Sequence, residues 1–169
     1  MKTFMRIILS AAILMFMFIS CEKEKDEESI NGKVIKQTDC KTFKSIINNA
    51  EVADTLSCVN YSFNTSENLL TLKHINTGFN CCPGELSCKV SFNNDTIIIQ
   101  EFEEQNACDC NCLFDLDIEV YGLKARNYYL KFIEPYRGEQ KKLFFEIDLQ
   151  NQADSTHCVF RDQYPWGMF

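Results

Sequence analysis

The stretch ACDCNCLFDLDIEV, residues 107–120, decides the fold class, because its second half alternates strictly between apolar and acidic residues. The residues of one parity are Cys112, Phe114, Leu116, Ile118 and Val120. A period of two is typical of a β-strand with one buried and one solvated face. The cysteines at 108, 110 and 112 fall at every second position, so an extended backbone would direct all three to one side.

Shorter alternating runs of the same kind lie on both sides of this stretch. They predict strands over residues 59–63, 69–75, 86–92, 95–102, 128–132 and 143–149. The segments NTSEN (64–68) and Asn93-Asn94 are suited to the turns between them, because asparagine tolerates a positive φ. Seven or eight short strands at this spacing predict an all-β fold, an antiparallel sandwich or barrel. The segment GLKARNYYLKF (122–132) resembles the strand-turn-strand step of immunoglobulin-like or prealbumin-like sandwiches, so a disulfide-rich antiparallel β-sandwich of one of these types is expected.

One short helix is expected before the strands. Thr38 or Asp39 could cap it, and Phe43, Ile46 and Ile47 would form its apolar stripe. No linker or internal repeat divides the rest of the chain, so residues 32–169 are expected to form a single cysteine-rich domain.

The first twenty residues have the organisation of a secretory signal peptide. Lys2 and Arg6 precede an apolar run from residue 7 to 19, which is short for a membrane span. The sequence FISC (18–21) resembles the lipobox of bacterial lipoproteins, although Phe18 stands where leucine is usual. The resemblance implies cleavage after Ser20 and lipid attachment at Cys21, which would anchor the mature protein to a membrane.

The segment after Cys21 is EKEKDEE, residues 22–28, and is expected to be part of a solvated tether over residues 21–31. An acidic run in this place resembles the surface-export signal of one group of Gram-negative lipoproteins. It implies an outer-membrane protein that faces the cell surface, with the periplasmic face as the alternative. The mature chain keeps 15 basic against 24 acidic residues, a net charge of −9 that disfavours nucleic acid as a partner.

Nine cysteines remain after Cys21, and export places them where disulfides form. The candidates are Cys40, Cys58, Cys81, Cys82, Cys88, Cys108, Cys110, Cys112 and Cys158. Nine is odd, so at least one is expected to stay unpaired within the chain. Residues i and i+2 of a strand are about 6.6 Å apart, too far for a bond between them. Cys108, Cys110 and Cys112 are therefore expected to pair elsewhere, with Cys81, Cys82 and Cys88 as the obvious second group.

A thiolate metal site is the alternative reading of these cysteines, since soft ions such as zinc and copper bind cysteine sulfur. Its ligands would come from Cys81, Cys82, Cys108, Cys110 and Cys112. The paired CxxC spacing of structural zinc sites is absent from the sequence. His74, on a predicted strand, is expected to be a hydrogen-bonded core residue. No cofactor is expected.

The sequence contains no GxSxG, HExxH or P-loop motif, so we expect a protein that is not an enzyme. Tyr164 and Trp166, in RDQYPWG (161–167), could contact a glycan or a protein partner if they are exposed. The segments HINTGFNCCPG, CDCNCLFDL and RDQYPWG together resemble small cysteine-rich lipoproteins of unassigned function. The expectation is a lipid-anchored binding or accessory module, with a metal-binding or a glycan-binding lipoprotein as alternatives.

Overall fold

The computed structural model describes residues 30–41, 52–163 and 165, and these form nine β-strands with no helix. The strands are β1 (Asn31–Gln37), β2 (Leu56–Asn64), β3 (Leu69–Asn80), β4 (Leu86–Asn93), β5 (Thr96–Glu103), β6 (Asn111–Tyr121), β7 (Asn127–Ile133), β8 (Phe144–Asp148) and β9 (Asp154–Phe160). The all-β class predicted from the alternating runs is confirmed for this part of the chain.

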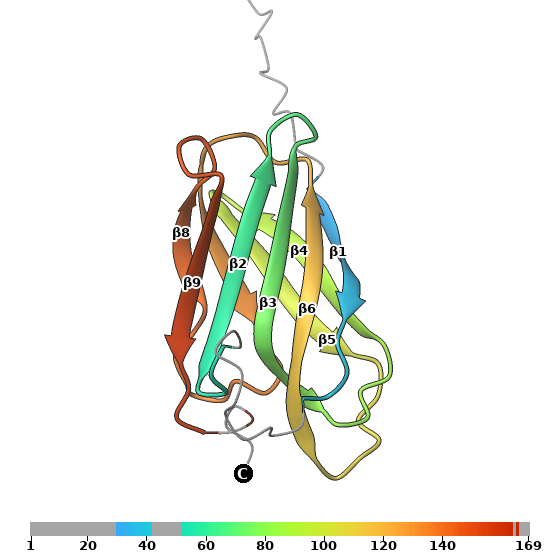
Figure 1. The fold of residues 1–169 in the computed structure, drawn as a ribbon. Helices are drawn as coiled ribbons and strands as arrows, with labels where there is room; N and C mark the ends of the chain where they lie inside the picture. Colours follow the sequence, from blue (N-terminus) through green and yellow to red (C-terminus); the bar gives the residue numbers. More distant parts are fainter. Residues whose placement is uncertain (1–29, 42–51, 164, 166–169) are drawn as a thin grey trace, which may run out of the picture.

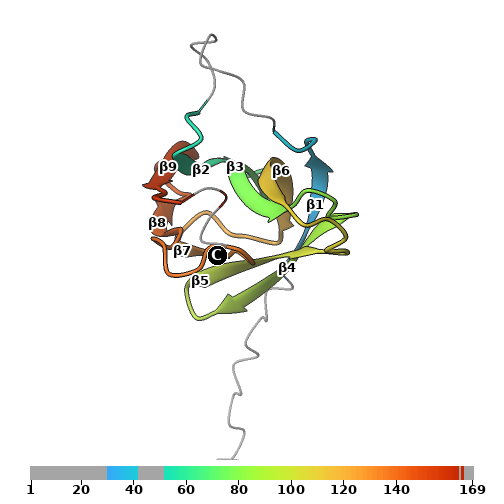
Figure 2. The same cartoon turned by 90° about the horizontal axis from the view of Figure 1, so that it is seen from below.

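The strands form two sheets that pack face to face as a sandwich (Figures 1 and 2). The order of the first sheet is β1-β6-β3-β2-β9, and that of the second is β4-β5-β7-β8. Side chains that point inward from both sheets form one apolar core, because each strand places every second residue on the same face. The predicted parity of residues 112–120 is confirmed: Cys112, Phe114, Leu116, Ile118 and Val120 are all buried.

The expectation of a wholly antiparallel sandwich is wrong at one position, since β5 and β7 pair in parallel. The chain leaves the second sheet after β5, crosses to the first sheet as β6 and returns as β7. Two strands separated by such a crossover can run in the same direction, whereas strands joined by a tight turn cannot. All other strand pairs are antiparallel.

The N-terminal part of the domain differs from the expectation. Residues 31–37 form strand β1, which pairs with β6, although residue 31 was expected to end the tether. Thr38 continues this pairing: its amide donates to the carbonyl oxygen of Asp115, and its hydroxyl accepts from the Asp115 amide. Most of the predicted helix falls on residues 42–51, which lie outside the described residues.

Cys108 and Cys110 are not part of a strand, which corrects the reading of residues 108–112 as extended along one face. Strand β6 begins at Asn111, and only Cys112 of the three lies in it, buried at 3% exposure. Cys108 and Cys110 belong to the loop that joins β5 to β6.

Candidate functional site

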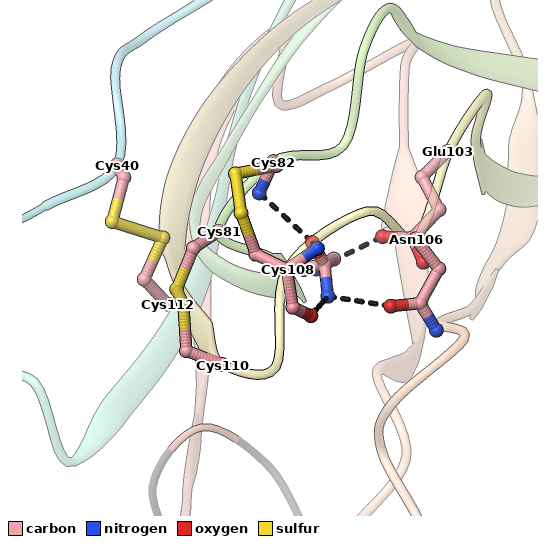
Figure 3. The surroundings of a disulfide bond; sticks show 9 residues. Cys40, Cys81, Cys82, Glu103, Asn106, Cys108, Cys110 and Cys112 are labelled. Atoms are coloured by element: carbon pink, nitrogen blue, oxygen red, sulfur yellow. Dashed lines mark hydrogen bonds between the residues drawn. A yellow bond between two sulfur atoms is a disulfide. The ribbon is translucent and has the colours of Figure 1, made fainter.

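Three disulfides cross-link one end of the sandwich. They join Cys40 to Cys112, Cys81 to Cys110 and Cys82 to Cys108, and a fourth joins Cys58 on β2 to Cys158 on β9. As predicted, the three alternate cysteines do not pair with one another. The adjacent Cys81 and Cys82 also have separate partners. The segment before residue 42, the loop after β3 and the loop before β6 are thereby tied together (Figure 3).

Cys88 was expected to pair with the alternate cysteines, and this is wrong. It is a free thiol on β4, and Cys112, one of the alternate cysteines, is bonded to Cys40 instead. Burial raises the pKa of the Cys88 thiol to about 11, with a further contribution from the charge of Glu101. A thiol with this pKa is protonated at neutral pH and is therefore a poor nucleophile.

The loops that are joined by the disulfides at this end of the sandwich are called the stapled loops. Asn80, the last residue of β3, connects them through hydrogen bonds of its side chain. Its Oδ1 accepts hydrogen bonds from the amides of Cys82, at 2.9 Å, and Cys108, at 3.1 Å. Its Nδ2 donates to the Cys108 carbonyl oxygen at 2.6 Å and to Asn106. The Asn80 amide donates to Glu103 Oε2 at 2.9 Å. One buried amide side chain thus holds both halves of the Cys82–Cys108 bridge.

Three sulfur atoms of this end gather closely. Those of Cys40, Cys81 and Cys112 all lie within 4.8 Å of one another. This set differs from the predicted metal ligands, because it includes Cys40 and leaves out Cys82, Cys108 and Cys110. All three sulfurs are engaged in disulfides, so they could bind a soft metal ion only after reduction.

A layer of polar side chains lies in the core next to the stapled end. We call it the polar layer; it consists of Ser57, His74, Thr77, Glu101, Glu134 and Arg161. Each of these residues is at most 7% exposed. Burial of charged groups is costly unless they are paired and hydrogen-bonded, and in this layer they are.

His74 connects the two sheets within the polar layer and is hydrogen-bonded, as predicted. Its Nδ1 lies 2.7 Å from Glu101 Oε1, and its Nε2 lies 3.0 Å from Ser57 Oγ. Burial alone would lower the pKa of His74. The charge and hydrogen bond of Glu101, together with the charge of Glu134, outweigh this and raise the pKa above its ordinary value.

Arg161 and Glu134 form the second buried pair of the polar layer. The Arg161 guanidinium donates from one nitrogen to both carboxylate oxygens of Glu134, at 2.6 and 2.7 Å. A second guanidinium nitrogen donates to the Lys141 carbonyl oxygen at 2.8 Å. These contacts attach the segment after β9 to the loop between β7 and β8.

Ser57, His74 and Glu101 reproduce the hydrogen-bond order of a serine–histidine–acid catalytic triad. Their exposures are 0%, 0% and 2%, so the serine oxygen is closed off from solvent and from any substrate. A nucleophile must reach the atom that it attacks, and this one cannot in the described structure. The arrangement acts here as a connection between the sheets.

The outer face of the second sheet carries several large exposed apolar side chains. Phe102, Tyr129, Ile133 and Phe144 point outward from β5, β7 and β8 and are 39–51% exposed. We call this surface, together with half-buried Ile98, the outer face. The Tyr129 and Phe144 rings stack with centroids 5.5 Å apart and 28° between their planes. Lys131 lies among these side chains, opposite Ile98 and Phe144. Larger exposed apolar patches mark interaction sites on soluble domains.

A depression of about 300 Å³ adjoins the outer face at Tyr129. It is lined by Asp95, Arg126, Asn127, Tyr128, Tyr129 and Glu146. Arg126 pairs with Asp95 at 2.5 Å, and its guanidinium carbon lies 4.3 Å from the centre of the Tyr128 ring. Asn127 Nδ2 donates to Glu146 Oε1 at 3.1 Å. Aromatic rings and hydrogen-bonding groups therefore meet at one place.

Most of the polar layer and all of the outer face were not predicted from the sequence, although signals for both exist. Glu101 continues the inward parity of Ile97 and Ile99, and Glu134 continues that of Leu130 and Phe132. A charged residue in a core register is a signal for a buried pair. The signal for the outer face is NYYLKFI (127–133), where Tyr129 and Ile133 add large apolar residues to the parity opposite that of Tyr128, Leu130 and Phe132.

Several predicted sites lie outside the described residues, namely Cys21, Tyr164 and Trp166. Within the described part of the chain, no helix is long and apolar enough to cross a membrane. No protein-family model, curated protein or solved structure matches this chain.

Proposed function

We propose that this protein is a lipid-anchored, extracytoplasmic binding module without catalytic activity, and that the outer face is its contact surface. The observation that carries the proposal is the cluster of Phe102, Tyr129, Ile133 and Phe144 on one side of one sheet. Four large apolar side chains are partly exposed to water, which is unfavourable. Burial against a ligand would stabilise the complex by about 25 cal/mol for each Å² of apolar surface covered.

The anchor is inferred from the leader and the lipobox-like FISC, with Cys21 as the lipid attachment site at the outer membrane. The arrangement of the strands fits a tether. Asn31 of β1 and Leu69 of β3 both pair with Tyr121, while Cys112 pairs with Phe79 at the far end of β6. A chain attached before Asn31 would hold the stapled loops away from the anchor (Figure 1).

Metabolic labelling tests the anchor. Growth with a labelled fatty acid should label the wild-type protein and leave the Cys21→Ala variant unlabelled, with the variant released from membranes. Protease added to intact cells should then digest the wild-type protein if it faces the surface, and should spare it if it faces the periplasm. Absence of label in the wild-type protein would contradict the lipid anchor.

Site-specific photo-cross-linking tests the contact surface. Benzoylphenylalanine placed at Phe144 should form an adduct with the partner in intact cells. The same group at Phe160 should not, because Phe160 is 56% exposed on the other sheet and serves as a matched control. Equal adducts at both positions, or none at Phe144, would contradict a role for the outer face.

Thiolate metal binding is the second candidate, and the gathering of three sulfurs at Cys40, Cys81 and Cys112 favours it. Cysteine thiolates are soft ligands, and soft ligands favour zinc or monovalent copper. The protein should then bind one ion per chain after phosphine reduction and none when oxidised, as measured by elemental mass spectrometry. A reduced protein free of metal after incubation with either ion would eliminate this candidate.

Two finer assignments remain proposals. The first is that the sandwich is of the immunoglobulin-like or prealbumin-like type, which the turn-and-strand segment 122–132 suggests. The second is that Tyr164 and Trp166 contribute to a glycan contact, which the loss of binding in Trp166→Ala would test.

A further inference from the structure

The depression beside Tyr129 combines an apolar wall with a set of polar groups. The Tyr129 ring, 44% exposed and stacked on Phe144, provides the wall. Carboxylates, an amide and a guanidinium from the surrounding residues provide hydrogen-bond acceptors and donors. In small-molecule sites, apolar contact supplies affinity and polar groups fix orientation.

Of the charges in the depression, one pair is satisfied within the protein, and one carboxylate is hydrogen-bonded to a neutral amide. Arg126 is engaged by Asp95, and Glu146 accepts from Asn127. The lining has two carboxylates and one guanidinium, and the mature chain as a whole is acidic. An anionic ligand would be repelled, because the lining carries one more carboxylate than guanidinium groups. The site therefore disfavours an anionic ligand.

A neutral ligand must match both parts of the lining. Aromatic rings carry a negative π-face, which attracts the weakly positive C–H groups of an apolar ligand face. Hydroxyl groups on the rim of such a ligand can donate to the Glu146 carboxylate and accept from the Asn127 amide. A sugar ring has one face of C–H groups and a rim of hydroxyls, whereas a purely apolar partner would leave the polar groups of the depression unmatched.

We infer that the depression formed by Tyr129, Asn127 and Glu146 is a binding subsite for a neutral saccharide. This inference rests on the proposed contact role of the outer face and adds the class of ligand. Phe144, stacked on Tyr129, extends the apolar platform along β8, so a second unit of an oligosaccharide would lie over the outer face. The bond between ligand and protein is non-covalent.

The test is a glycan array probed with the detergent-solubilised full chain. The array carries neutral oligosaccharides together with sialylated and sulfated ones. The wild-type protein should bind neutral glycans and none of the anionic ones. Tyr129→Ala should weaken binding at least tenfold, and Asn127→Ala severalfold. Tyr129→Phe should retain most of the binding, because it keeps the ring.

Phe160→Ala is the matched control and should bind as the wild type does, since it removes an exposed aromatic ring from the other sheet. The inference fails if no neutral glycan binds, if anionic glycans bind better, or if Tyr129→Ala binds as the wild type does. Cross-linking at Phe144 without binding to any glycan would retain the contact role of the outer face and overturn only the saccharide class.

Discussion

His74 Nδ1 lies 2.7 Å from Glu101 Oε1, and this contact joins a strand of the first sheet to a strand of the second inside a fully enclosed core. Both side chains are excluded from solvent. The neighbours of His74 within the layer include a second carboxylate, Glu134, whose Oε1 lies 3.9 Å from His74 Nε2. The strength of the contact therefore depends on whether the imidazole is protonated.

The free energy of unfolding should depend on pH through His74. Its pKa is raised above 6.5 in the folded protein, so the folded state holds the proton more tightly than the unfolded state does. The stabilisation is fully present below pH 6.5 and is lost as the pH rises through the folded pKa. Urea denaturation between pH 6 and 9 measures this, and His74→Gln should remove the contribution.

The other histidine provides the control for this experiment. Burial, with a smaller effect of the Lys141 charge, lowers the pKa of His157, so its contribution has the opposite sign. His157→Gln should leave the decline in stability above pH 6.5 in place. A decline that persists unchanged in His74→Gln would show that another group causes it.

Removing Arg161 should destabilise the protein strongly, because Glu134 would be left buried and unpaired. We expect Arg161→Met to lower the free energy of unfolding by about 3–5 kcal/mol. The double variant Arg161→Met, Glu134→Leu should recover most of that loss, since it removes both charges. Urea denaturation measures both variants, and a double variant as unstable as the single one would contradict the pairing.

Alkylation of the unreduced, denatured protein should modify one thiol, that of Cys88. The remaining cysteines of the mature domain are bonded in the four pairs given above, and peptide mapping should recover those pairs. Loss of the Cys58–Cys158 bridge should cost about 2–5 kcal/mol, because it closes the longest loop, with a sequence separation of 100 between its two cysteines. Several modified thiols would contradict this connectivity.

Gly32→Ala should destabilise the contact between β1 and β4 at one edge of the sandwich. A Cβ atom at Gly32 would lie 2.6 Å from the carbonyl oxygen of Glu119 and 2.6 Å from Val90 Cγ2. Overpacking of this kind costs about 1–3 kcal/mol. Val90→Ala in the same chain should relieve only part of the loss, because the other close atom belongs to the backbone. Thermal unfolding measures both.

The sequence predicts the parts of this fold whose patterning is local. Residues 112–120 and 86–92 alternate because one face of each strand meets the core, and a burial pattern is readable without knowing the partner strand. Strand β9 was missed, since Val159 is the one inward residue in it that is buried and apolar. The parallel pairing of β5 and β7 has no local signal, because it follows from the path of the chain between them.

The candidate site was less predictable, for a related reason. The members of the polar layer come from positions as far apart in the sequence as Ser57 and Arg161. Their contacts can therefore form only when both sheets have formed. It was equally impossible to predict from the sequence that Cys88 is the free thiol, because this depends on which segment lies close to Cys112 in the folded protein. Tyr129 and Phe144 looked like ordinary strand residues until the register placed them side by side on the solvent face.

Hydroxyl-radical footprinting in intact cells, compared with the purified protein, tests the central claim that the outer face is the binding surface. Oxidation of Tyr129 and Phe144 should fall severalfold in cells relative to the purified protein, while that of Phe160 should not change. Equal oxidation of Tyr129 and Phe144 in both settings would show that nothing covers the outer face and would contradict the account.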